Sequence, residues 1–472
     1  MLFIWAVKNA IIGNISMGSA TQTSSPQWSS RLAFTLAAIG SSVGLGNLWR
    51  FSAEAGTHGG GAFILIYLLC VLVIGIPTIM GEFIIGRAGR ATSAINSFED
   101  VATRSNSTKR WSLGASVGTL SGFLIVSFYC VIAAWVMAYI QRFMVGAFDG
   151  LTPTQIAEQF DSLIADPKAL LGYFLLFSGL VIWLVARGVN RGLELASKIF
   201  MPIFFFLLLA LSAFSLYSAW PSGGTEQALD FMFSADMSKI SPKVAISALG
   251  QAFFSLGLGM AIMITYGSYL PKSVSLAQSA LIVGLADTAV ALIAGLAIFP
   301  IVFQYGLDFE AGAGLFFQTL PTALLSTPGG NIIGAAFFCM AFFAALTTAV
   351  SLLEPSVAHI SEQYQLKRAH GALIMGVIMI IVGSVSLYNL NFLDFLDSGL
   401  TAPILLPLSA LMVVIFVGWR LNKKVLNDEL SEADRKLAYV LFFMLKYIAP
   451  VMIFVIFVAG ISDRYFPSLL AG

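Results

Sequence analysis

The feature that most constrains this chain is a series of apolar segments, each long enough to cross a lipid bilayer. The hydrocarbon core of a bilayer is about 30 Å thick, so a spanning helix needs roughly 20 apolar residues. Hydrophobic residues make up 58% of the chain and charged residues only 10%, which excludes a soluble globular protein. The sequence therefore predicts an all-α polytopic membrane protein with eleven transmembrane helices. These spans are expected at residues 31–56, 62–88, 111–144, 169–186, 190–217, 243–270, 277–305, 331–364, 371–388, 395–421 and 437–461.

Lysine and arginine are distributed unevenly among the segments that connect these spans. Sixteen of them lie on one side, in alternate connections that include Lys198, and five lie in the other connections. Because cytoplasmic loops carry the excess of positive charge, we expect a multi-pass plasma-membrane protein with its amino terminus in the cytoplasm and its carboxy terminus outside. Residues 1–27 are interpreted as a flexible cytoplasmic tail.

The residues that usually carry enzyme chemistry form no recognisable group in this sequence. Its three cysteines stand alone within apolar runs, and its three histidines are scattered near predicted helix ends. Nucleotide-binding, nucleophile and paired-carboxylate motifs are also absent from the sequence. We therefore expect neither an enzyme nor a nucleotide-driven pump, and neither a bound cofactor nor a nucleic-acid partner.

The segment "GSSVGLGNLWRF" (40–51) places polar residues in the middle of the first span. A continuous helix would bury Asn47 and Arg50 at membrane depth, where charge is expensive. Gly44 and Gly46 make unwinding easier, and an unwound turn is tolerated there only where it is enclosed by protein or lines a cavity. Its free carbonyls can bind a cation and its free amides an anion. The alternative is that these glycines only allow close helix packing.

A second "GLG", at Gly257–Gly259, lies in the sixth predicted span and follows Ser255. Two interrupted helices five spans apart predict inverted repeats whose breaks meet near the membrane midplane. The expected organisation is a first repeat at 28–217, a second repeat at 243–421 and an additional helix at 437–461.

These segments resemble the neurotransmitter:sodium symporter family, and in particular its eleven-span bacterial amino-acid transporters. The resemblance covers nearly everything from Trp28 to Phe457. It rests on "WSSRLAFTLAAIGSSVGLGNLWRF", "GGGAFILIYLLCVLVIGIPTIMGEFIIGR", "FFSLGLGM" and "LTTAVSLLEP". The resemblance implies a leucine-transporter fold and sodium-coupled amino-acid transport, with an amino acid, two sodium ions and the lipid bilayer as partners.

The resemblance implies two sodium sites beside the first break. The first would use the Ser42 carbonyl, the side chains of Asn47, Ser255 and Asp287, and the carboxylate of the substrate. The second would use the carbonyls of Gly40, Val43 and Ala344 with the hydroxyls of Thr347 and Thr348. Taken alone, the two threonines are more typical of hydroxyls that bond to their own helix.

The implied substrate pocket recognises the backbone and the side chain of an amino acid separately. The amides of Leu45 and Gly46 and the Tyr129 hydroxyl would bind the carboxylate, and Phe254, Ser255 and Gly257 would lie near the amine. The side chain would contact Ile125, Phe254, Met260, Thr348 and Leu352. Because this set contains no charged residue, a neutral hydrophobic side chain is favoured. Gly257 and Met260 are smaller or more deformable than the residues of a leucine-transporting relative, which suggests room for a bulky or aromatic side chain.

Gate residues are implied on both sides of this pocket. Arg50 would pair with Asp397 above Phe254, and Tyr269 and Glu362 occupy inner-gate positions. The usual arginine three residues before Trp28 is replaced by Ser25, which leaves the inner partner open. Gly192, followed ten residues later by Pro202, matches members whose fifth helix unwinds at its inner half.

The resemblance also indicates which positions would bind chloride. Tyr67, Gln251 and Ser255 match the chloride-site positions of the family, but Asp287 stands where most relatives have asparagine and Ala291 where others have serine or glutamate. A fixed carboxylate can replace the charge of chloride beside sodium, so we expect chloride independence. A proton-coupled transporter or exchanger, or a sensor without transport, remains an alternative on the same fold.

Overall fold

The computed structural model describes residues 27–307, 313–430 and 435–466, and every regular element among them is helical. Within these described residues, nine helical stretches are long and apolar enough to cross a membrane, and the bent pair α2 (Arg31–Ser42) with Gly46–Thr57 makes a tenth when it is counted as one span. The shorter helices α12 (Pro242–Ser255) and α13 (Ile262–Ser268) lie where the sixth span was predicted. The nine continuous stretches are Gly61–Gly89, Lys109–Met144, Pro167–Ala186, Val189–Ala219, Leu276–Gln304, Gly330–Gln363, Arg368–Tyr388, Leu390–Arg420 and Arg435–Tyr465.

The first predicted break is present. Helix α2 ends at Ser42, and Val43 has an extended backbone. The chain then resumes in a π-helical turn, Gly46–Arg50, that leads into α3 (Phe51–Thr57), and the two halves are bent by 56°. The side-chain oxygen of Asn47 accepts a hydrogen bond of 3.0 Å from the Gly44 amide. This residue therefore satisfies a backbone group that the break leaves free.

The second break separates α12 from α13. Gly257, Gly259 and Ala261 all have positive φ, between 58° and 73°. Glycine adopts this left-handed region without a steric penalty, so the two glycines of the motif allow a turn that other residues resist. A carboxylate oxygen of Glu82 in α5 (Ile76–Gly89) accepts a hydrogen bond of 2.9 Å from the Gly259 amide. The unwound segment is thus anchored by a neighbouring span.

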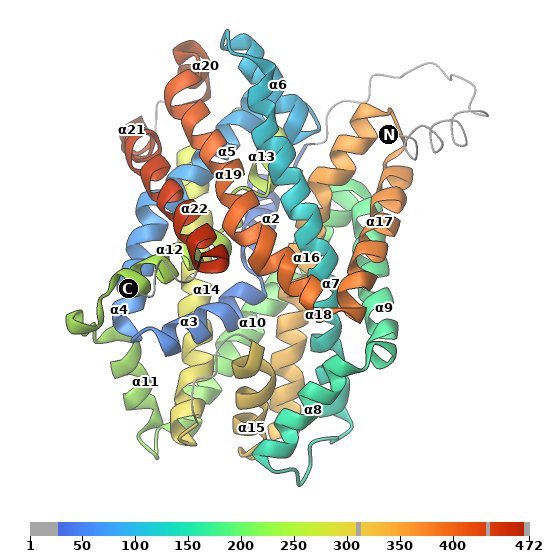
Figure 1. Cartoon of the computed structure of the whole chain (residues 1–472), viewed down its shortest axis with the longest axis vertical. Helices are drawn as coiled ribbons and strands as arrows, with labels where there is room; N and C mark the ends of the chain where they lie inside the picture. The colour runs from blue at the N-terminus through green and yellow to red at the C-terminus, as the bar shows by residue number, and fades with distance from the viewer. Residues whose placement is uncertain (1–26, 308–312, 431–434, 467–472) are drawn as a thin grey trace.

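Several connections that the sequence analysis treated as loops contain helices. At one end of the molecule, the upper end in Figure 1, lie α6 (Ala94–Arg104) and α20 (Lys423–Glu429). At the opposite end lie α8 (Pro153–Ala165), α11 (Gly224–Phe233) and α15 (Leu320–Leu325) (Figure 1). Helices α6 and α20 lie in the connections that are rich in lysine and arginine. Helices α8, α11 and α15 lie in the connections that are poor in these residues.

The long helices surround the two breaks. Helix α7 (Leu113–Met144) packs along α16 (Gly330–Gln363), and α10 (Glu194–Ala219) packs against α2, α14 (Leu276–Gln304) and α16. The unwound segments are therefore enclosed by protein, which is the condition for irregular backbone at membrane depth.

Candidate functional site

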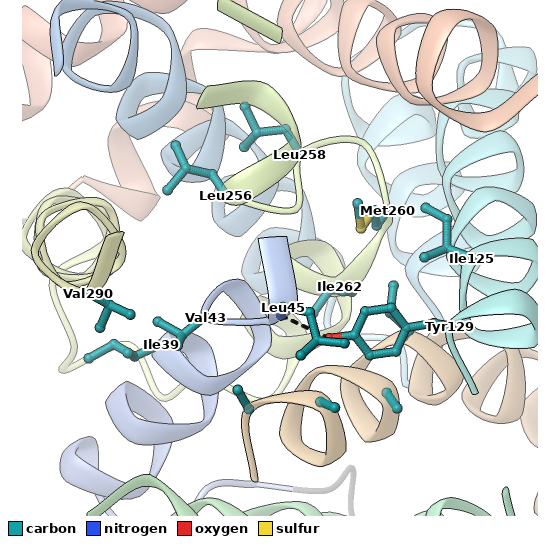
Figure 2. Packing of buried hydrophobic residues seen from close by; sticks show 14 of the residues in the cluster. Ile39, Val43, Leu45, Ile125, Tyr129, Leu256, Leu258, Met260, Ile262 and Val290 are labelled. Atoms are coloured by element: carbon teal, nitrogen blue, oxygen red, sulfur yellow. Dashed lines mark hydrogen bonds between the residues drawn. The ribbon is translucent and has the colours of Figure 1, made fainter. Parts of the chain in front are cut away.

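A cavity lies between the two breaks and is bounded on its other sides by α7 and α16. The ten residues predicted to bind substrate all line it, together with Ser41, Ser42, Gly44 and Asn47. Figure 2 shows Ile125 and Tyr129 of α7 directed toward Leu45 and Met260 of the two unwound segments. The ten are Leu45, Gly46, Ile125, Tyr129, Phe254, Ser255, Gly257, Met260, Thr348 and Leu352.

Tyr129 connects α7 to the first break. Its hydroxyl oxygen accepts a hydrogen bond of 3.1 Å from the Leu45 amide (dashed line in Figure 2). The hydroxyl proton stays available to donate, because the oxygen is the acceptor in this bond. The Tyr129 phenol and the Leu45 amide thus adjoin on the cavity wall, where the phenol proton can be donated to an anionic group such as a carboxylate.

Asp287 is the centre of a polar cluster beside this wall. Its carboxylate accepts hydrogen bonds from the Asn47 amide at 2.8 Å and the Ser255 hydroxyl at 2.7 Å, and the Tyr67 hydroxyl lies at 3.5 Å. The Ser42 hydroxyl donates to the Leu256 carbonyl at 3.4 Å, which places the end of α2 beside the second break. The structure therefore brings together three side chains predicted for the first sodium ion, those of Asn47, Ser255 and Asp287, and the role of the Ser42 carbonyl stays a prediction.

The charge of Asp287 has no protein counterion in this cluster. The residue is fully buried, and no lysine, arginine or histidine nitrogen lies within 4.0 Å of its carboxylate in the part of the chain that the structure describes. A buried carboxylate without a cation carries a desolvation cost of several kcal/mol. Oxygen ligands with one uncompensated negative charge suit a hard cation.

The second predicted ion site joins α2 to α16. The Thr348 hydroxyl lies 3.3 Å from the Gly40 carbonyl and 3.0 Å from the Val43 carbonyl. The Thr347 hydroxyl instead donates within its own helix, to the backbone carbonyls of Phe343 at 3.2 Å and Ala344 at 3.1 Å. Thr348 thus adjoins two predicted carbonyl ligands across the helix interface, whereas Thr347 shows the local bond typical of an ordinary helical threonine.

The predicted outer ion pair is not formed in this structure. The Arg50 guanidinium lies over the Phe254 ring, 4.6 Å from its centroid, and makes no ion pair within 4.0 Å among the described residues. One carboxylate oxygen of Asp397 is buried without a hydrogen-bond partner. Pairing of Arg50 with Asp397 stays a prediction about another conformation of the outer gate.

The inner side holds an acid that the sequence analysis missed. The Tyr269 hydroxyl lies 3.1 Å from Glu354, and Arg368 forms an ion pair with the same carboxylate. Glu362 instead accepts hydrogen bonds from the backbone amides of Thr92 and Ser93. An acidic residue inside the apolar run "AVSLLEP" was the available signal. Ser25 lies outside the described residues.

The fifth span is wound where unwinding was predicted. Gly192 lies in the π-helical turn η4 (Val189–Leu193), and Pro202 lies inside α10.

Near the predicted chloride position, the side-chain amide of Gln251 donates a hydrogen bond of 3.3 Å to the Gly46 carbonyl. Among the described residues, the side-chain oxygen of Gln251 is buried without a hydrogen-bond partner. Ala291 is fully buried. Roles in unwinding and in chloride dependence stay predictions.

Comparison with known proteins identifies the family. Residues 25–149 and 159–469 match the profile of the sodium:neurotransmitter symporter family. The chain belongs to this family. An uncharacterized sodium-dependent transporter of Bacillus subtilis, YhdH, is 36% identical over 91% of this chain and 96% of the relative. An uncharacterized sodium-dependent transporter of Haemophilus influenzae is 32% identical, over 92% of this chain and 98% of its own. This symporter is therefore a multi-pass membrane transporter and not an enzyme, and its coupling ion is sodium.

A solved structure gives the fold of the symporter independently. The crystal structure of MhsT in complex with L-phenylalanine matches with a TM-score of 0.83 at 39% identity, and the match covers 92% of this chain and 99% of that one. The predicted all-α fold with interrupted first and sixth spans is confirmed. The division into two repeats and an additional helix, and the orientation in the membrane, stay predictions.

Proposed function

We propose that this symporter imports a neutral, hydrophobic L-amino acid together with two sodium ions by alternating access. The observation that carries this proposal is the cavity between the two breaks, where the Leu45 amide and the Tyr129 hydroxyl adjoin a cluster centred on Asp287. A zwitterion fits such a site, since its carboxylate meets donors. The match to a relative solved with L-phenylalanine supports the same substrate class.

The cavity lining favours an apolar substrate side chain. None of the fourteen lining residues is ionisable except Tyr129, so a charged side chain would be buried without a partner. A β-carbon placed on Gly257 would meet only the Met260 sulfur, at 3.7 Å. The space beside this glycine and the flexibility of methionine support a substrate with a bulky or aromatic side chain.

Coupling follows from the position of Asp287. A sodium ion beside this carboxylate supplies the missing positive charge and attracts the carboxylate of the substrate. Each ligand then raises the affinity for the other by the same factor, because binding linkage is reciprocal. Because Asp287 already provides a fixed negative charge next to Ser255, we also propose that transport does not require chloride.

The proposed setting is the plasma membrane, with the amino terminus in the cytoplasm. The end that carries α6 and α20 is the one rich in lysine and arginine, which supports this orientation. The alternatives are proton-coupled transport or exchange, and amino-acid sensing without transport.

Uptake into proteoliposomes, with sodium, proton and chloride gradients set separately, tests the proposal. We expect accumulation of labelled phenylalanine or leucine driven by inward sodium, and competition by hydrophobic but not charged amino acids. Tyr129→Phe should weaken substrate binding about tenfold, the effect of one lost hydrogen bond to a charged group. Tyr364→Phe, at a half-exposed tyrosine, is the control. Accumulation driven by protons without sodium would favour the first alternative, and sodium-dependent binding without accumulation the second.

A further inference from the structure

The last span carries a lysine inside its apolar run. Lys446 lies in "LFFMLKYIAP" (441–450), within the helical stretch Arg435–Tyr465. The apolar run ends at Ile461, and a bilayer core that takes about 20 helical residues would then begin near Phe442. Lys446 is thus about one helical turn inside the hydrocarbon core. A lysine at this depth extends its side chain toward the interface, because its charge is costly in hydrocarbon.

The ammonium of Lys446 lies over two aromatic rings. It is 5.1 Å from the centroid of the Trp419 ring and 5.4 Å from that of Tyr447. The two rings pack edge to face at 5.8 Å, and they are 59% and 49% exposed. Tryptophan and tyrosine concentrate at the membrane interface, so these rings place the ammonium at the level of the lipid headgroups. Contact with a ring attracts the cation but does not neutralise it.

This arrangement is fixed by a close contact between two spans. The π-helical turn η8 (Phe416–Arg420) packs against the π-helical turn η9 (Met444–Ile448). The Trp419 indole donates a hydrogen bond of 3.1 Å to the Lys446 carbonyl. A β-carbon on Gly418 would lie 3.0 Å from the Lys446 α-carbon, so the glycine allows the two turns to approach. The rings and the ammonium therefore form a preorganised group.

No acidic side chain balances this charge in the part of the chain that the structure describes. The Lys446 ammonium makes no ion pair within 4.0 Å there, and neither does Arg420, which is exposed and directly follows Trp419. In the neighbouring α20, Glu429 is already paired with Arg87. The surface around the last span also faces outward, since only 28% of its most apolar window is buried in protein. The missing anion is thus expected from the lipid.

We propose that Lys446 and Arg420 bind the phosphate of an anionic phospholipid, with Trp419 and Tyr447 packed on its glycerol and upper acyl chain. A headgroup with net negative charge is favoured over a zwitterionic one, because the latter would bring a second ammonium beside Lys446. Trp419, Arg420, Lys446 and Tyr447 are hereafter the lipid site. None of them lines the cavity between the two breaks, so this inference goes beyond the proposed function and does not depend on it.

A lipid in this site would connect two spans. Its headgroup contacts η8 through Arg420 and η9 through Lys446, and a ligand that binds only the folded protein stabilises it. Anionic phospholipid should therefore raise the thermal stability of the protein in detergent, and zwitterionic phospholipid should raise it less.

Native mass spectrometry of the full-length protein, with phosphatidylglycerol or phosphatidylcholine added at equal concentration, measures binding directly. The wild type should retain phosphatidylglycerol in preference to phosphatidylcholine. Lys446→Gln should retain about fivefold less phosphatidylglycerol, the effect expected for one basic residue at a membrane surface, whereas Lys446→Arg should retain it as the wild type does. The matched control is Lys109→Gln, at an exposed lysine paired with Glu99, which should not change retention.

Thermal unfolding of the same proteins in detergent provides a second readout. Phosphatidylglycerol should raise the Tm of the wild type, inorganic phosphate should not, and the increase should shrink in Lys446→Gln. Arg420→Gln, at an exposed side chain, should weaken retention in the same direction and serves if Lys446→Gln does not fold.

Four results would overturn the lipid site. Equal retention of phosphatidylglycerol by Lys446→Gln and Lys109→Gln would show that the lysine binds no lipid. Equal retention of both lipids by the wild type would show apolar contact alone. Stabilisation by inorganic phosphate would show a site for a free anion, and a dimer that excludes lipid would show that a second copy covers this face. Failure of sodium-driven uptake would count against the proposed function alone.

Discussion

Asp287 brings a negative charge into the centre of the molecule without a protein cation beside it. Among the residues that the structure describes, its carboxylate accepts hydrogen bonds only from neutral donors, including Asn47 and Ser255. Neutral donors stabilise a carboxylate but leave its net charge in place, and the charge is then balanced most simply by a bound cation. The ion dependence of transport should therefore change when this one charge is removed.

Asp287→Asn tests the chloride account. The wild-type protein should transport equally well with chloride or with a large organic anion, because the carboxylate already supplies the negative charge. The variant should bind sodium more weakly and should regain transport when chloride is added, measured as uptake at increasing sodium concentrations in both salts. Asp394→Asn, at an exposed ion pair with Arg464, is the matched control. A variant that transports without any response to chloride would contradict the account.

At the scale of single residues, the sequence indicated the residues that line the cavity but not the acidic residues that hold the neighbouring segments in place. The ten predicted substrate residues line one cavity because the breaks that carry several of them are encoded locally by glycine and asparagine. Glu82 and Glu354 were missed. Their partners, the Gly259 amide and Arg368, lie on other segments, and no local pattern encodes such a contact.

At the scale of elements, the two breaks are built differently. The first is short, and a side chain, Asn47, satisfies the Gly44 amide. The second spans six residues, with positive φ at Gly257, Gly259 and Ala261, and is attached to a neighbouring helix by Glu82. Gly259 is the most constrained of these, because a β-carbon there would lie 2.3 Å from the Leu406 carbonyl.

Gly259→Ala should therefore destabilise the protein and impair substrate binding together. Left-handed backbone and overlap with a carbonyl each cost a non-glycine residue about 1–3 kcal/mol. Gly250→Ala is the matched control, since it lies inside α12 with no atom within 4 Å of the new carbon, and it should gain about 0.5–1 kcal/mol. Thermal unfolding in detergent and equilibrium binding measure the two effects. Equal behaviour of the two variants would show that the break tolerates a side chain.

The helices within the connections show where the prediction from sequence was incomplete. Hydropathy detects spans, but α6 and α8 are short and amphipathic, so they do not appear in a hydropathy profile. Their capping residues were visible: Ser93 caps α6, and Thr152 with Gln155 forms a capping box at the start of α8. Tertiary packing decides whether such short segments are helical, and this is not read from a local pattern.

At the scale of the whole molecule, the lysine- and arginine-rich end is held together by a buried ion pair. Arg87, at the end of α5, lies 2.6 Å from the Glu429 carboxylate of α20, and its guanidinium also donates to the Glu429 and Val274 carbonyls. The two side chains are only 3% and 5% exposed. Three segments far apart in the sequence therefore meet at one guanidinium, each of whose three nitrogens donates to a carboxylate or carbonyl oxygen, as a buried charge requires.

Arg87→Ala should accordingly be among the most destabilising substitutions at this end. Removing one partner leaves the Glu429 carboxylate buried without a cation, which costs about 3–5 kcal/mol, whereas Arg464→Ala at the exposed pair with Asp394 should cost about 0–1 kcal/mol. Thermal unfolding in detergent compares the two. The double variant Arg87→Met with Glu429→Leu should recover part of the loss, because no unpaired charge remains. If Arg87→Ala were no more destabilising than Arg464→Ala, water would have to reach this ion pair, and the three segments would be held by apolar packing instead.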